Sequence, residues 1–206
     1  MRVSFAALHL QHVPKAVVAV DLGYSAKKRS GGVAWTGCPA PLHVQFGDCV
    51  TLVAERLRSM HRPVLVLEAV LSTLHLNSGN PSIRGDFETG RGWYWGPGAV
   101  SALAAQRFLS ELAGRLPASI LLAEAFLSNK DIRTPDGDDA HAIVLGFSKS
   151  KPVEMFPQAQ PLLPCIDGVP SVRVFHPLNG SARSPHTLVQ ADVPKAARLL
   201  TQRHQI

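Results

Sequence analysis

Apolar residues occur in short runs separated by turn-forming and charged residues, and this pattern predicts a layered α/β fold. Runs at 16–23, 31–37 and 42–46 predict three strands that follow one another as an antiparallel meander. Runs at 63–71 and 119–127 predict two further strands. The first run is rich in valine, so we expect it to form a central strand that is buried on both faces of the sheet.

Helical periodicity accounts for the segments between the later strands. Residues 49–61, with Asp48 as the predicted N-cap, and residues 99–116 carry apolar side chains at helical spacing, and 136–147 predicts a last core helix. Residues 72–98 hold six glycines and two prolines and are predicted to form one long loop. Helical crossovers imply parallel pairing, so we expect a mixed five-stranded sheet, three antiparallel strands and then parallel ones, flanked by helices.

The chain changes character near residue 148. Residues 1–147, with a core proper from about residue 16, carry a net charge of +2, whereas residues 148–206 carry +4 and eight of the sixteen prolines. In the second part only a strand at 171–175 and a terminal helix at 193–203 are predicted. We therefore expect one α/β core and a basic, proline-rich C-terminal extension packed on it.

Composition indicates a globular protein. The 206 residues are 46% hydrophobic with a mean hydropathy of +0.08, which is typical of a globular chain. No apolar run approaches the roughly 20 residues of a membrane span, and the first residues lack a signal-peptide cleavage site, so a cytoplasmic protein without membrane contact is expected. Three scattered cysteines, Cys38, Cys49 and Cys165, are expected to be reduced packing residues. The net charge of +6 is compatible with a polyanionic partner or with ordinary solubility.

Carboxylates stand at the ends of apolar runs, where burial of an unpartnered charge is costly. Asp21 ends the first predicted strand, Glu68 stands late in the fourth, and Asp136, Asp138 and Asp139 open the last predicted helix. A hard divalent cation such as Mg²⁺ or Mn²⁺ is the natural partner of such a group. Two such ions about 4 Å apart can promote phosphodiester cleavage.

These segments carry a resemblance to a known superfamily. The strand VAVDLGYS, the Gly-Val-Ala second strand, the strand VLVLEAVL and the helix start DGDDAHA resemble the RNase H-like nucleases, and among them most closely the RuvC-type resolvases, over roughly residues 16–147. The resemblance implies an RNase H-like fold and two bound Mg²⁺ or Mn²⁺ ions. It also implies catalytic and metal-binding roles for Asp21, Glu68, Asp136 and Asp139.

Each acid also has a structural interpretation. Asp21 could cap a turn, and Asp138 is better explained as the N-cap of the last helix than as a ligand. Asp136 and Asp139 could be ordinary first-turn acids. Glu124, in the fifth strand, could reach the same end of the sheet or pair with a cation at a sheet edge, and it is left outside the site. His141 is expected to be packed or exposed rather than catalytic.

Basic and aromatic side chains in two loops are the candidates for substrate binding. Arginine and lysine contact phosphates, and aromatic rings stack on bases. A solvated hairpin tip explains the basic residues after the first strand equally well, and the tryptophans could instead anchor their loop on the core. The predicted substrate-binding residues are Lys27, Lys28, Arg29, Arg84, Arg91, Trp93 and Trp95.

The resemblance implies a metal-dependent endonuclease that hydrolyses phosphodiester bonds in nucleic acid, with DNA favoured over RNA. A catalytically silent nucleic-acid-binding or adaptor protein on the same fold is the alternative. A nucleotide phosphotransferase or ATPase of the actin and sugar-kinase type is disfavoured, because that architecture needs two such domains. Nucleic acid is the expected partner, and a homodimer is compatible with the sequence.

Overall fold

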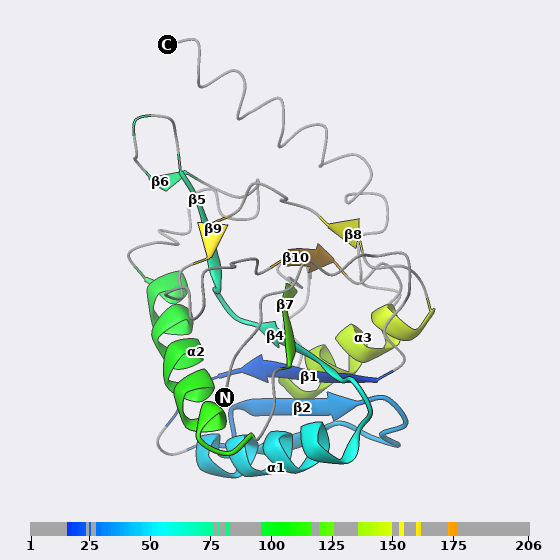
Figure 1. Cartoon of the computed structure of the whole chain (residues 1–206). Coiled ribbons are helices and arrows are strands. Elements are labelled where there is room, and N and C mark those ends of the chain that lie inside the picture. The colour runs from blue at the N-terminus through cyan, green and yellow to red at the C-terminus, as the bar shows by residue number, and fades with distance from the viewer. Residues whose placement is uncertain are drawn as a thin grey trace.

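The computed structural model describes residues 16–23, 25, 28–75, 78, 81–82, 96–116, 120–125, 136–149, 153–154, 160–161 and 173–176. Within them the chain forms, in order, β1 (Val17–Leu22), β2 (Gly31–Trp35), β3 (Leu42–Val44), α1 (Phe46–Ser59), β4 (Val64–Glu68), β5 (Ser72–His75), β6 (Pro81–Ser82), α2 (Pro97–Ala113), β7 (Leu121–Ala125), α3 (Asp136–Lys149), β8 (Val153–Glu154), β9 (Gln160–Pro161) and β10 (Arg173–His176) (Figure 1). The terminal helix predicted at 193–203 lies outside the described residues.

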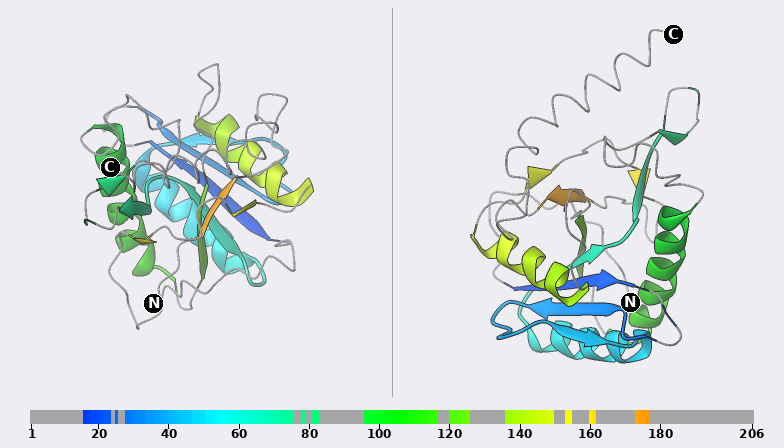
Figure 2. Two further views of the ribbon diagram at one scale, coloured as in Figure 1. Left: turned by 90° about the horizontal axis from the view of Figure 1, so that it is seen from above. Right: turned by 180° about the vertical axis from the view of Figure 1, so that it is seen from behind.

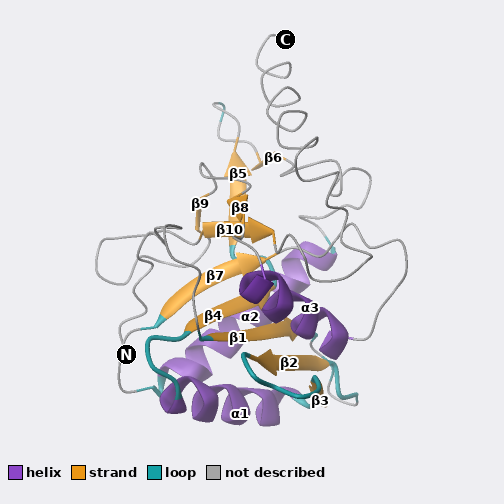
Figure 3. Ribbon diagram, turned by 90° about the vertical axis from the view of Figure 1, so that its right-hand side faces the viewer, coloured by secondary structure: helices purple, strands orange, loops and turns teal. Residues whose placement is uncertain are grey.

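A mixed sheet with the strand order β3-β2-β1-β4-β7-β10-β8 runs through the centre of the described structure (Figure 3). The β1–β2 and β2–β3 pairs are antiparallel, whereas the β1–β4, β4–β7 and β7–β10 pairs are parallel. The predicted α/β class, with an antiparallel meander followed by parallel strands, is confirmed. The five strands β3-β2-β1-β4-β7 form the predicted mixed arrangement, and β10 and β8, which come from the region after residue 148, extend the same sheet.

Helices cover the sheet on both faces (Figure 2). On β1, Val18 and Val20 pack with the buried side chains of α1 and α2, whereas Val17 and Ala19 pack with those of α3. This alternation explains why the first strand is apolar throughout: side chains on both of its faces are buried. No helix in the described part of the chain is long and apolar enough to cross a membrane.

Helix α1 starts earlier than its sequence indicates. The N–H of Cys49 donates to the carbonyl oxygen of Gln45 over 2.8 Å, so the helix begins at Phe46, and Gln45 occupies the N-cap position without a side-chain hydrogen bond. Asp48, predicted as the cap, instead lies in the first turn, where a negative charge favours the helix dipole. The strand predicted at 42–46 is correspondingly shorter and ends at Val44.

The strand predicted at 63–71 is too long, because its last three residues lie outside both sheets. Strand β4 ends at Glu68, and after three further residues the chain enters β5, which pairs antiparallel with β6 and with β9. The prediction of a single loop over 72–98 is therefore wrong, because it contains β5, β6 and the start of α2. β9 comes from the region after residue 148, so that region contributes to both sheets.

Candidate metal centre

Two of the predicted acids lie side by side at the carboxyl ends of two central strands of the sheet. In the parallel pairing of β1 with β4, Asp21 is in register with Glu68, the last residue of β4. Along their strands they alternate with the residues that face α1 and α2, so both share the face of Ala19 and Val66, which is covered by α3. Because parallel strands end at the same edge, the carboxyl ends of β1 and β4 present the two carboxylates together.

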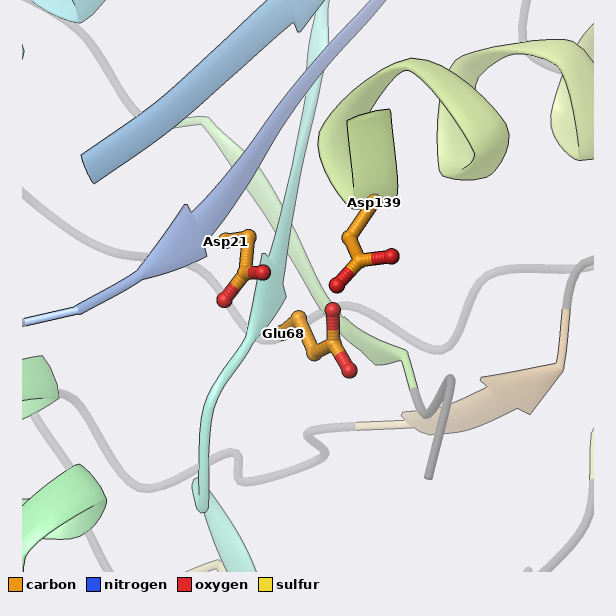
Figure 4. A group of neighbouring side chains, drawn as sticks. All are labelled: Asp21, Glu68 and Asp139. Atoms are coloured by element: carbon orange, nitrogen blue, oxygen red, sulfur yellow. The ribbon is translucent and has the colours of Figure 1, made fainter. Parts of the chain in front are cut away.

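The third acid comes from α3. Asp139 lies in the first turns of the helix and is 4% exposed. Its position follows from the packing of α3, since Ala140, Ile143 and Phe147 are buried against the sheet in the same cluster as Ala19. The helix therefore presents its amino-terminal end, with the Asp139 carboxylate, to the edge where β1 and β4 end (Figure 4).

The three carboxylates form a compact group. One oxygen from each of Asp21, Glu68 and Asp139 lies within 4.8 Å of the other two. In an octahedral Mg²⁺ site neighbouring oxygen ligands are about 3 Å apart and opposite ones about 4.2 Å, so the carboxylates would move inward to share one cation. Three negative charges this close repel one another, and a divalent cation would relieve that repulsion. The donor set, made only of carboxylate oxygens, suits a hard cation such as Mg²⁺ or Mn²⁺.

The fourth predicted ligand, Asp136, is the first residue of α3, three positions before Asp139. Its side chain lies outside the described residues. The helix starts at this residue, so Asp138 is already inside the first turn, and its prediction as the N-cap is wrong. The error has a simple cause: consecutive acids are all good caps, and spacing alone does not select which of them begins the helix.

Glu124 does not lie on an edge strand, so the predicted pairing with a cation at a sheet edge is wrong. It lies on β7 between β4 and β10, is fully buried, and faces α1 and α2 like its neighbour Leu122. Its carboxylate accepts a hydrogen bond from the Ser72 hydroxyl over 2.5 Å. Glu124 is therefore on the opposite face of the sheet from the three clustered acids. The sequence contained no signal for Ser72, because one serine after an apolar run is ordinary.

The segment that connects β1 to β2 begins two residues after Asp21, and its two ends lie close together. A Cβ at Gly23 would lie 2.1 Å from the backbone oxygen of Ser30, so this close approach requires glycine. Lys28 and Arg29, two of the predicted substrate-binding residues, are exposed in this segment. The other five, Lys27, Arg84, Arg91, Trp93 and Trp95, lie outside the described residues.

The acidic group of the described residues consists of carboxylates and contains no histidine or cysteine. His141, which follows Asp139 on α3, is half-buried, and its Nδ1 atom has no hydrogen-bond partner in the part of the chain that the structure describes. Cys49 is buried in the core and Cys38 is half-buried, and both are free thiols. Burial raises the pKa of the Cys49 thiol to about 12, so it is neutral at physiological pH. Cys165 lies outside the described residues.

Comparisons of the chain with protein-family models, with curated proteins and with solved structures found no match.

Proposed function

We propose that this protein is a metal-dependent endonuclease that hydrolyses phosphodiester bonds in nucleic acid. The observation that carries the proposal is the convergence of Asp21, Glu68 and Asp139, from three separate elements, on one group with oxygens within 4.8 Å. The resemblance to the RuvC-type resolvases selects these three acids, together with Asp136, from the 15 Asp and Glu residues of the chain. Because those resolvases act on DNA, DNA is the favoured substrate.

The arrangement of the sheet supports an RNase H-like fold for this chain. The resemblance implies three antiparallel strands followed by parallel strands, with acids at the ends of the first and fourth and at the start of a later helix. The strand order β3-β2-β1-β4-β7 has this arrangement, and α3 approaches the edge where β1 and β4 end. The added strands β10 and β8 lie beyond β7, so they do not change the order of the five strands that carry and flank the acids.

In the proposed reaction the chain has two tasks. Asp21, Glu68 and Asp139, with Asp136 as the fourth proposed ligand, hold the cations. When bound, a pair of divalent cations supplies the Lewis acidity that activates a water molecule and stabilises the leaving oxygen. Lys28 and Arg29, exposed in the segment after β1, supply positive charge for the phosphate backbone next to this group.

A cleavage assay tests the proposal. Labelled single strands, duplexes, RNA–DNA hybrids and four-way junctions are incubated with the full chain and Mg²⁺ or Mn²⁺, and each reaction is repeated with EDTA. The variant Asp21→Asn keeps the shape of the side chain but removes a charged ligand, so cleavage should fall by several orders of magnitude. Asp48→Asn is the matched control, because Asp48 is exposed in α1 outside the acidic group and its loss should leave cleavage unchanged.

Other outcomes would contradict the proposal. If Asp21→Asn cleaves as well as the wild type, the activity comes from another site or from a contaminant. If the wild type binds the substrates tightly but cleaves none of them with either metal, the protein is a nucleic-acid-binding adaptor and not a nuclease.

A further inference from the structure

The chain leaves the main sheet directly after Glu68, and side chains from two other elements hold it there. The backbone N–H of Val70 donates to the Ser101 hydroxyl of α2 over 3.2 Å. Two residues later, the Ser72 hydroxyl donates to the Glu124 carboxylate of β7 over 2.5 Å. Ala69, Val70 and Leu71, which connect Glu68 to Ser72, are all buried. Two hydrogen bonds therefore hold the segment that follows β4 against α2 and β7.

The Glu124 carboxylate cannot itself belong to the metal centre. It is in register with Leu67 and faces α1 and α2, whereas the Glu68 side chain, one residue further along β4, faces α3. Burial of a carboxylate is costly, and an apolar side chain of similar volume would fill this space without that cost. Packing therefore does not explain why β7 carries an acid at this position, whereas its bond to Ser72 does.

On the basis of the proposed function, we infer that Glu124 is a positioning residue for the metal centre. Through Ser72 it holds the backbone that follows Glu68, and this keeps the Glu68 carboxylate within reach of Asp21 and Asp139. Glu124 lies on the opposite face of the sheet from the three clustered acids, so its effect on the metal centre is indirect, through this backbone.

Binding of Mn²⁺ alone to the full chain, measured by isothermal titration calorimetry, tests the inference without requiring cleavage. Loss of a residue that orients a ligand typically costs about 10–100-fold in metal affinity, and this is the loss expected for Ser72→Ala and for Glu124→Leu. Glu124→Gln retains an oxygen that can accept the Ser72 hydrogen bond, so its affinity should stay close to that of the wild type. Amide hydrogen exchange over residues 69–72 should become faster in the first two variants only.

A matched control separates positioning from a general loss of stability. Leu122 lies on the same strand and the same face as Glu124, two residues earlier, and is buried. Leu122→Val removes apolar volume but leaves the Ser72 bond, so its Mn²⁺ affinity should equal that of the wild type. All titrations are performed well below the unfolding midpoint of each variant. If Glu124→Leu does not fold, the Mn²⁺ affinity of Ser72→Ala is compared with that of the wild type instead. Ser72→Ala removes only a single oxygen.

Three results would contradict the role of Glu124 without contradicting the proposed metal centre. The first is that Ser72→Ala binds Mn²⁺ with wild-type affinity. The second is that Leu122→Val loses as much Mn²⁺ affinity as Glu124→Leu. The third is that Glu124→Gln loses as much Mn²⁺ affinity as Glu124→Leu. A wild-type chain that binds no Mn²⁺ would instead remove the proposed function, and the inference with it. Asp21→Asn, which should abolish binding, shows that the titration reports on the acidic group.

Discussion

Gly23 allows the backbone near Asp21 to lie close to Ser30, at the other end of the segment that connects β1 to β2. A Cβ at this position would meet the backbone oxygen of Ser30 at 2.1 Å, and backbone atoms cannot rotate away as a side chain can. Gly23→Ala should therefore lower the free energy of unfolding by about 1–3 kcal/mol. It should also weaken Mn²⁺ binding, because the displaced backbone adjoins Asp21. Urea unfolding and calorimetric titration measure the two effects.

Gly47→Ala is the control for that substitution. Gly47 lies in the first turn of α1, and a Cβ there would have no heavy atom within 4 Å. Because alanine favours the helix, this variant should be neutral or more stable by up to about 1 kcal/mol, with unchanged Mn²⁺ affinity. Equal destabilisation of both variants would show that the contact with Ser30 is not the cause.

Cys49 predicts a decline of stability in alkaline solution. Burial raises its pKa from 9.0 to about 12. Below pH 9 the thiol is neutral in both states, but between pH 9 and 12 it ionises only in the unfolded chain. The free energy of unfolding should then fall by up to about 1.4 kcal/mol per pH unit, a contribution that Cys49→Ala removes. Urea unfolding at pH 7, 9 and 10 measures the slopes, and identical slopes in both proteins would contradict the assignment.

Single residues differ in how much their sequence context reveals. An acid in an apolar run is conspicuous because its burial is costly, so Asp21 and Glu68 could be selected before the fold was known. Glu124 has the same context, but the face it occupies depends on the register of β7, which no local pattern encodes. Ser72 is meaningful only through Glu124, its partner 52 residues away, and could not be predicted at all.

At the scale of elements, α2 packs against α1 through aromatic rings. Phe108 of α2 is fully buried, and its ring centroid lies 6.2 Å from that of Phe46, with the planes at 79°. Phe108→Ala should therefore lower the free energy of unfolding by about 3–5 kcal/mol, because it removes a large buried side chain and leaves a cavity. The shift of the urea midpoint measures this loss.

Leu103→Ala is the comparison on the same helix. Leu103 is 66% exposed, so its truncation should change the free energy of unfolding by no more than about 0.5 kcal/mol. A loss as large as that of Phe108→Ala would mean that the outer face of α2 is covered in solution.

Helices and strands were predictable where their periodicity is clear, and their limits were not. The apolar run at 63–71 reads as one strand because all of its residues except the half-buried Glu68 are buried, yet β4 ends at Glu68. Burial continues beyond that point because α2 and β7 enclose the chain as it turns towards β5. A pattern of apolar residues records burial but not the partner that causes it, so it cannot mark the change from one sheet to the other.

For the whole molecule, positive charge should control nucleic-acid affinity. Each phosphate contact by a lysine or arginine contributes about 0.9 to the slope of log affinity against log salt concentration on duplex DNA. Replacement of Lys28 and Arg29 together by glutamine should therefore weaken binding and make this slope shallower by about two units. Fluorescence anisotropy with a labelled duplex at several salt concentrations measures both quantities.

Arg62→Gln serves as the control for this pair. Arg62 is exposed but precedes β4, at the opposite end of that strand from Glu68. Its loss should leave the slope unchanged. An equal change would mean that binding follows total charge rather than the surface beside the acidic group.

The strand β10, which flanks β7 on its outer side, arrives late in the chain. Arg173 of β10 pairs with Ala123 of β7, fifty residues earlier. During synthesis the backbone edge of β7 that pairs with β10 therefore has no partner strand until β10 has left the ribosome. An unpaired strand in this state readily recruits a strand from another molecule. A chain shortened before residue 173 would remain in that state, so aggregation rather than translation should limit its yield in cells.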